Sequence, residues 1–288
     1  MNRIYKNKSS EYGLILAAGL LLAVGIGIML YPFLSSRWNA LHESRAIRSY
    51  QKMEESGDDK DLNLLLEKAE TYNRRLAADD GRWKFSEERH SSYMQQLNPD
   101  GSGLMGYIRI PAINVSLPIY HGTDDHVLAK GIGHLEGSSL PVGGSGTHTV
   151  LSGHRGLPTA RLFTDLDKLE EGDTFMIHVL NRELIYRIDQ ISVVLPEENS
   201  FLAIPEEDDY CTLMTCTPYG VNSHRLLLRG SRVCEPDSAL LETEESSGFL
   251  LGFLHGIDSY LIPAGAAFIF IILSKIAAKH KHGRRKRL

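Results

Sequence analysis

Three residue types that together can carry out acyl transfer lie near the ends of predicted strands. Cys216 ends the apolar run of residues 210–215 and precedes a Pro-Tyr-Gly turn, so we expect its thiol at an exposed strand end. The thiolate is the nucleophile in cysteine chemistry, and a thiol near its ordinary pKa needs a neighbouring base to become one. Arg225 begins the next predicted strand and can fold back across the turn towards Cys216.

A base lies at another predicted strand exit upstream. Residues 147–155 read THTVLSGHR, a short strand followed by a turn that contains His154. The chain has twelve histidines, so only these surroundings single out His154. A cysteine, a histidine and an arginine can together attack an amide, protonate the leaving amine and stabilise an oxyanion. Side-chain alternation places Arg225 and Arg229 on one strand face, so alternation alone does not exclude Arg229 as the arginine that acts with Cys216.

The segment TLMTCTPYG, followed by HRLLLRG and preceded upstream by Gly-His, resembles the sortase family, and within it class C, whose members polymerise pilins. The resemblance covers roughly residues 107–233 and implies a role for each of the three residues. Cys216 would be the nucleophile, His154 its acid/base partner, and Arg225 the group that stabilises the oxyanion and the bound sorting peptide. Thr215 and Ser152 are candidate supports of the site. The thiol and the imidazole need no cofactor, and no cysteine or histidine cluster indicates a metal site.

The resemblance implies a transpeptidation in two steps. Cys216 would cleave an LPxTG-like sorting signal of a pilin to give a thioester, and a lysine amine of another pilin would resolve it. A sortase that anchors proteins to the cell wall through a peptidoglycan amine is the alternative. A papain-type hydrolase places its cysteine before its histidine, whereas His154 precedes Cys216 here. The alternative that is not an enzyme is an anchored pilus scaffold or binding module with an inert cysteine.

The elements around these residues indicate a mainly β domain. From Gly106 on, short apolar runs alternate with glycine and proline, a pattern typical of a sandwich or barrel. The resemblance implies an eight-stranded sortase-type β-barrel with short helices. We expect one helical insertion over residues 125–135 and a turn of helix within residues 160–169.

A helical segment is predicted ahead of the barrel. Residues 37–53 and 59–78 have helix-forming composition, and Ser-Gly-Asp-Asp separates them. Class C relatives often place a lid here, in which an Asp-Pro-aromatic triplet covers the catalytic cysteine. This chain has no Asp-Pro dipeptide, and the lid position offers Asp80 as the acid and Trp83 or Phe85 as the aromatic residue. Packing of both aromatic residues within the helical segment is the alternative.

Two apolar segments near the chain ends predict a membrane location. Residues 12–36 are 25 residues without a charge, and about 20 suffice to cross the hydrocarbon core. The run is longer than the apolar region of a cleaved signal peptide. Residues 259–274 form a second uncharged run, and basic residues before the first run and after the second predict that both termini are cytoplasmic. The net charge of −5 gives no support to a nucleic-acid partner, whereas membrane lipid is an expected one.

These features predict seven consecutive segments. They are a cytoplasmic basic N-terminus (1–11), a transmembrane helix or signal anchor (12–36), an extracellular helical segment (37–103) with a lid at 79–86, a catalytic β-barrel (104–235), a linker (236–257), a second transmembrane helix (258–278) and a cytoplasmic basic tail (279–288). The odd number of cysteines, Cys211, Cys216 and Cys234, implies no disulfide framework.

Overall fold

The computed structural model describes residues 2–233, so the predicted linker, second transmembrane helix and basic tail lie outside the described residues. Helix α1 (Asn2–Ser56) contains both the predicted span 12–36 and the predicted helix 37–53. Its stretch from Gly19 to Ser56 is long and apolar enough to cross a membrane. Gly57 separates α1 from helix α2 (Asp59–Ala77), at the break that the sequence predicts.

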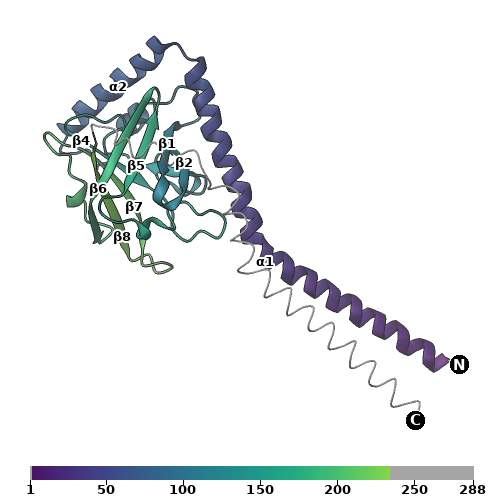
Figure 1. The fold of residues 1–288 in the computed structure, drawn as a ribbon. Helices are drawn as coiled ribbons and strands as arrows, with labels where there is room; N and C mark the ends of the chain where they lie inside the picture. Colours follow the sequence, from purple (N-terminus) through teal and green to yellow (C-terminus); the bar gives the residue numbers. More distant parts are fainter. Residues whose placement is uncertain (1, 234–288) are drawn as a thin grey trace. The chain divides into compact units, whose positions relative to one another are not determined.

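Eight strands form a closed barrel in the order β1-β2-β3-β4-β7-β8-β6-β5, which confirms the predicted mainly β, eight-stranded architecture (Figure 1). The strands are β1 (Leu104–Ile110), β2 (Val115–His121), β3 (Ile132–His134), β4 (Thr147–Ser152), β5 (Thr174–Val179), β6 (Arg182–Val194), β7 (Asp209–Thr217) and β8 (His224–Arg232). The short helices are α3 (Glu87–Met94), α4 (Asp125–Leu128), η1 (Pro111–Ile113), η2 (Leu166–Lys168) and η3 (Ser200–Leu202).

The predicted helix over residues 125–135 is wrong beyond Leu128. The chain forms only the four-residue helix α4 and then strand β3, which pairs with β2 and with β4. Gly133 lies so close to the Gly122 carbonyl that an added Cβ would come within 2.3 Å of the carbonyl oxygen. Pairing with two distant strands therefore outweighs the local helical pattern. The predicted helical turn within residues 160–169 is present as η2.

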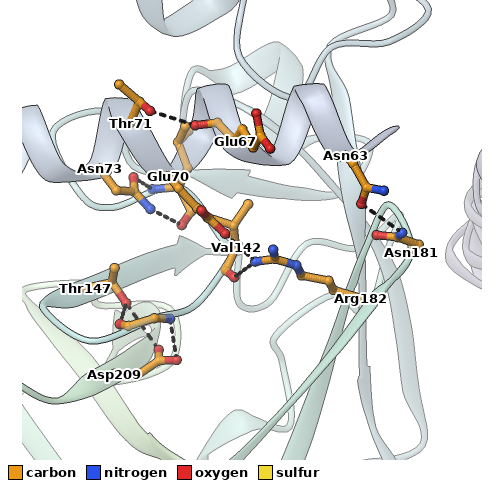
Figure 2. A network of polar contacts seen from close by, with 12 residues as sticks. Asn63, Glu67, Glu70, Thr71, Asn73, Val142, Thr147, Asn181, Arg182 and Asp209 are labelled. Carbon is orange, nitrogen blue, oxygen red and sulfur yellow. Dashed lines mark hydrogen bonds and ion pairs between the residues drawn. The ribbon is translucent and has the colours of Figure 1, made fainter. Parts of the chain in front are cut away.

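Polar contacts fasten the helical segment to the barrel, and those of Asn73 and Tyr50 are buried. The Asn73 side chain of α2 donates to the Leu140 carbonyl at 3.1 Å and accepts from the Leu140 N–H at 2.7 Å, and Glu70 pairs with Arg182 of β6 at 2.8 Å (Figure 2). The Tyr50 hydroxyl of α1 donates to the Met105 carbonyl of β1 at 2.8 Å. Because buried polar groups are costly to leave unpaired, these contacts specify where α1 and α2 meet the strands.

Candidate active site

Strands β7 and β8 place Cys216 directly opposite Arg225. The two residues are antiparallel partners in the last part of the ladder, so their side chains project from the same face with Cβ atoms about 5 Å apart. The Arg225 guanidinium donates to the carbonyls of Asn222 and His224 at 3.4 and 3.3 Å, which keeps it at the loop that joins the two strands. A half-buried thiol and a cation thus share one end of the barrel.

His154 follows β4, which runs parallel to β7. Ser152 is the register partner of Met214, and the Gly153 N–H continues the ladder by donating to the Met214 carbonyl at 3.0 Å. His154 is the second residue after the end of β4, on the side of the barrel where the neighbouring strand β7 ends with Cys216 and Thr217. The structure therefore brings the three sequence-predicted catalytic residues to the ends of adjacent strands.

The two predicted support residues lie on opposite sides of these strands. Thr215 points into the barrel, is 1% exposed, and donates its hydroxyl to the Gly153 carbonyl at 2.8 Å. This hydrogen bond holds the backbone just before His154 from the inside of the barrel. Ser152 is half-buried and, as the partner of Met214, lies on the outer face with Cys216.

Two glycines allow the loop that carries His154 to pack tightly. A Cβ at Gly153 would lie 2.6 Å from the Phe163 ring, which is fully buried under this loop. Gly156 has a φ of +80°, in the left-handed region that favours glycine, and a Cβ there would lie 2.8 Å from the Tyr219 ring. The Phe163 N–H donates to the His154 carbonyl at 3.1 Å and closes the loop.

An apolar groove runs along the outer face of β4, β7, β8 and β6. Val150, Val194, Leu202 and Leu227 form its buried cluster, and three half-buried residues, Trp83, Leu135 and Met214, pack against them. A cavity of about 170 Å³ lies within this groove and is lined by both Trp83 and Arg225. The groove therefore reaches Arg225, the strand partner of Cys216, and its mostly apolar lining can take an apolar side chain.

His148 anchors the loop that forms one wall of the groove. Its Nδ1–H donates to the Ala203 carbonyl at 2.7 Å, and its Nε2 accepts from the Thr212 hydroxyl at 2.7 Å. Burial lowers the pKa of His148 to about 4, against the opposing hydrogen bond to Ala203, so the ring is neutral at pH 7. Arg82 adds a second anchor by donating to the Leu202 carbonyl at 3.1 Å. Neither contact could be predicted from the sequence, because both join residues distant in the chain.

Arg229, the competing arginine, has its own partners. Its Nε and one terminal nitrogen donate to the two Asp189 carboxylate oxygens at 3.0 and 3.1 Å, and its guanidinium lies 4.3 Å from the centre of the Tyr210 ring. This geometry is that of a bidentate surface ion pair. The geometry therefore favours Arg225 over Arg229 for a role beside Cys216.

The two described cysteines differ in environment, and both are free thiols. Cys211 lies inside the barrel, where burial raises the pKa of its thiol well above the ordinary range. Cys216 lies on the outer face at the strand end and is half-buried. Cys216 is thus the better placed of the two to act as a nucleophile, and Cys234 lies outside the described residues.

The residues of the predicted lid do not lie together. Trp83 packs into the outer groove and lines the cavity that reaches Arg225. Asp80 is exposed, and the Phe85 side chain is 74% exposed. Of the three lid candidates, the structure places only Trp83 at the groove.

Known proteins are similar to the part of this chain that forms the barrel. Residues 108–233 match the model of the sortase domain, a range that includes Cys216, His154 and Arg225. Sortase D from Bacillus subtilis is 33% identical over 140 residues, which are 48% of this chain and 68% of that protein.

Solved structures give the same result at higher identity. Sortase C1 from Streptococcus agalactiae is 48% identical with a TM-score of 0.64, and the match covers 67% of this chain and all of that one. Sortase C from Clostridium perfringens, solved with a C-terminal cell wall sorting motif, is 43% identical with a TM-score of 0.56, and the match covers 66% of this chain and 98% of that one. The chain therefore belongs to the sortase family, whose members are cysteine transpeptidases, and its solved structural neighbours are sortases of class C.

Proposed function

We propose that this protein is a membrane-anchored class C sortase that joins pilin subunits. The observation that carries the proposal is the pairing of Cys216 with Arg225 across β7 and β8 inside a sortase domain. His154, two residues after the neighbouring strand β4, supports it. A cysteine, a histidine and an arginine at one strand end supply the nucleophile, the proton and the positive charge that amide exchange requires.

The first step forms an acyl-enzyme. The Cys216 thiolate attacks the carbonyl carbon of a Thr-Gly amide, and a C–S bond forms while Arg225 donates hydrogen bonds to the oxyanion. The C–N bond then breaks, and His154 gives its proton to the leaving amine. The products are a thioester on Cys216 and the released C-terminal segment.

The second step transfers the acyl group. The neutral amine of a pilin lysine attacks the thioester carbonyl, His154 accepts the proton of the attacking nitrogen, and the C–S bond breaks to regenerate the Cys216 thiolate. The product is an amide bond between two pilins. A peptidoglycan amine would give the same chemistry with a different product.

The groove supports the proposed substrate class. Its lining includes the apolar residues Met214, Leu227 and Val194 and also Arg225, so it suits an apolar side chain of an LPxTG-like signal bound close to Cys216. The Clostridium perfringens relative was solved with such a sorting motif. The apolar part of α1 supports an anchor in the membrane. We propose that both termini are cytoplasmic and that the barrel faces outwards.

A peptide assay tests the proposed function. The protein is incubated with an LPxTG-like peptide alone, with a lysine-containing pilin peptide, or with a peptidoglycan-type amine, and the products are identified by mass spectrometry. We expect an amide to the lysine side chain, formed at least about tenfold faster than an amide to the peptidoglycan amine. Preference for the peptidoglycan amine would support the cell-wall-anchoring alternative. A free acid in every reaction would indicate a hydrolase, and an unchanged peptide would indicate a scaffold.

Trp83 is proposed to cover the groove, whereas Phe85 takes no part in the cover. Trp83→Ala should raise the rate at which a bulky thiol reagent labels Cys216, by about tenfold, because a residue packed from a separate segment can open at small energetic cost. Phe85→Ala is the matched control, because its exposed ring covers nothing in the groove. Equal labelling rates in wild type and Trp83→Ala would make residues 79–86 packing of the helical segment only.

A further inference from the structure

Arg155 joins the loop that carries His154 to the end of strand β7, which carries Cys216. It follows His154 directly, and one of its terminal nitrogens donates to the hydroxyl of Thr217, the residue after Cys216, at 3.4 Å. The other terminal nitrogen forms an ion pair with Asp167 of η2. The Arg155 side chain is only 10% exposed. The residue after His154 thus contacts both the residue after Cys216 and a third segment, η2.

The packing around Arg155 strengthens this link. Its guanidinium carbon lies 5.9 Å from the centre of the Tyr219 ring, in the loop between β7 and β8. The same ring fills the space that a Cβ at Gly156 would occupy. One face of the largely exposed Tyr219 ring therefore packs against the segment of Arg155 and Gly156, so the loop after β4 and the loop between β7 and β8 are in direct contact.

Stability alone does not account for an arginine at this place. Its Nε–H is buried and has no hydrogen-bond partner among the described residues. Burying a guanidinium is costly, and an apolar residue of similar volume is often as stabilising or more so. Unlike an apolar residue, the guanidinium makes directional hydrogen bonds to both Thr217 and Asp167.

We propose that Arg155 is a positioning residue that fixes His154 relative to Cys216 by tying the loop of His154 to the end of strand β7 and to Asp167. Arg155 acts through His154 and does not contact the reacting atoms. The inference rests on the proposed roles of Cys216 and His154.

The expected effect follows from the geometry of proton transfer. The imidazole must come within about 3 Å of the group with which it exchanges a proton, and a misplacement of about 1 Å can lower a rate about 100-fold. The groove floor of Met214, Leu227 and Val194 does not include Arg155. Loss of Arg155 should therefore lower kcat and leave KM for the sorting peptide nearly unchanged.

Four variants of the full chain test the proposal by kcat and KM for cleavage of an LPxTG-like peptide. Arg155→Ala should lower kcat about 100-fold with KM changed less than about threefold. Arg155→Lys should recover part of the loss, because an ammonium can still pair with Asp167, and Asp167→Asn should show a smaller fall. Arg161→Ala is the control, because Arg161 lies on the same loop, pairs with Asp165 and is exposed.

A second readout separates positioning from general structural support. The rate of Cys216 alkylation by iodoacetamide, measured from about pH 5 to about pH 9, follows the thiolate population. Arg155→Ala should shift this profile in the wild-type background and cause no further shift in the His154→Ala background. Equal shifts in both backgrounds, or an unchanged kcat in a folded Arg155→Ala protein, would overturn the proposal.

Folding and the assumed roles are checked in the same experiment. Near-UV circular dichroism reports whether each variant is folded. If Arg155→Ala does not fold, Arg155→Lys and Asp167→Asn test the role of Arg155 in its place. An unchanged kcat in both of these variants would contradict the proposal. If Cys216→Ala stays active, the proposed catalytic roles themselves are wrong. If Cys216 and His154 prove essential while Arg155→Ala has no effect on kcat, only the role of Arg155 is wrong.

Discussion

Replacing Cys216 with alanine should abolish the acyl-enzyme and lower the rate of amide cleavage by about 10⁴-fold or more, as expected when a covalent nucleophile is lost. The fold should be kept, because Cys216 lies at the half-buried end of β7 and the change removes one sulfur. Mass spectrometry after incubation with the peptide measures the adduct, and thermal unfolding measures the fold.

Cys211→Ala is the matched control for this prediction. Cys211 lies inside the barrel on the same strand, fully buried. Its replacement should leave the adduct in place and lower the free energy of unfolding by about 1 to 2 kcal/mol, because it creates a small cavity in the core. An adduct that persists in Cys216→Ala and disappears in Cys211→Ala would contradict the assignment of the nucleophile.

Arg225→Ala should lower kcat/KM about 100- to 1,000-fold, the usual effect of removing a donor to a developing oxyanion. Arg229→Ala should change kcat/KM less than about threefold and cost about 1 kcal/mol of stability, because it breaks a partly exposed ion pair with Asp189 and a contact with the Tyr210 ring. Steady-state kinetics and thermal unfolding of the two variants measure both effects.

The two arginines serve as mutual controls because they lie on the same face of β8. A loss of activity at Arg229 as large as that at Arg225 would mean that the arginine has been misassigned. An unchanged kcat/KM in Arg225→Ala would mean that another group stabilises the oxyanion.

Local signals in the sequence were sufficient for much of the fold. The alternating apolar residues of β7 and β8 and the Pro-Tyr-Gly turn between them predicted a strand, an exposed cysteine and a returning arginine, and the structure has this hairpin with Cys216 opposite Arg225. Helix α1 was predictable because its apolar stretch and its end before Gly57 are both encoded locally. The pattern of short strands indicated a sandwich or a barrel, and the choice of an eight-stranded barrel came from the family resemblance.

Features that depend on distant contacts could not be predicted in the same way. β3 was mistaken for helix because its strand identity comes from pairing with β2 and β4. The ion pair of Arg155 with Asp167 joins two residues whose spacing matches no regular element. Trp83 and Phe85 are close in the sequence, but only Trp83 packs in the groove, since that depends on strands about a hundred residues away.

The most direct test of the account is the mass of the protein after incubation with an LPxTG-like peptide in the absence of an amine. The account predicts an added mass equal to the acyl part of the peptide, located on the proteolytic fragment that contains Cys216. Adding a lysine-containing peptide should remove that mass and yield the corresponding amide. An adduct on any other residue, or amide formation without Cys216, would contradict the account.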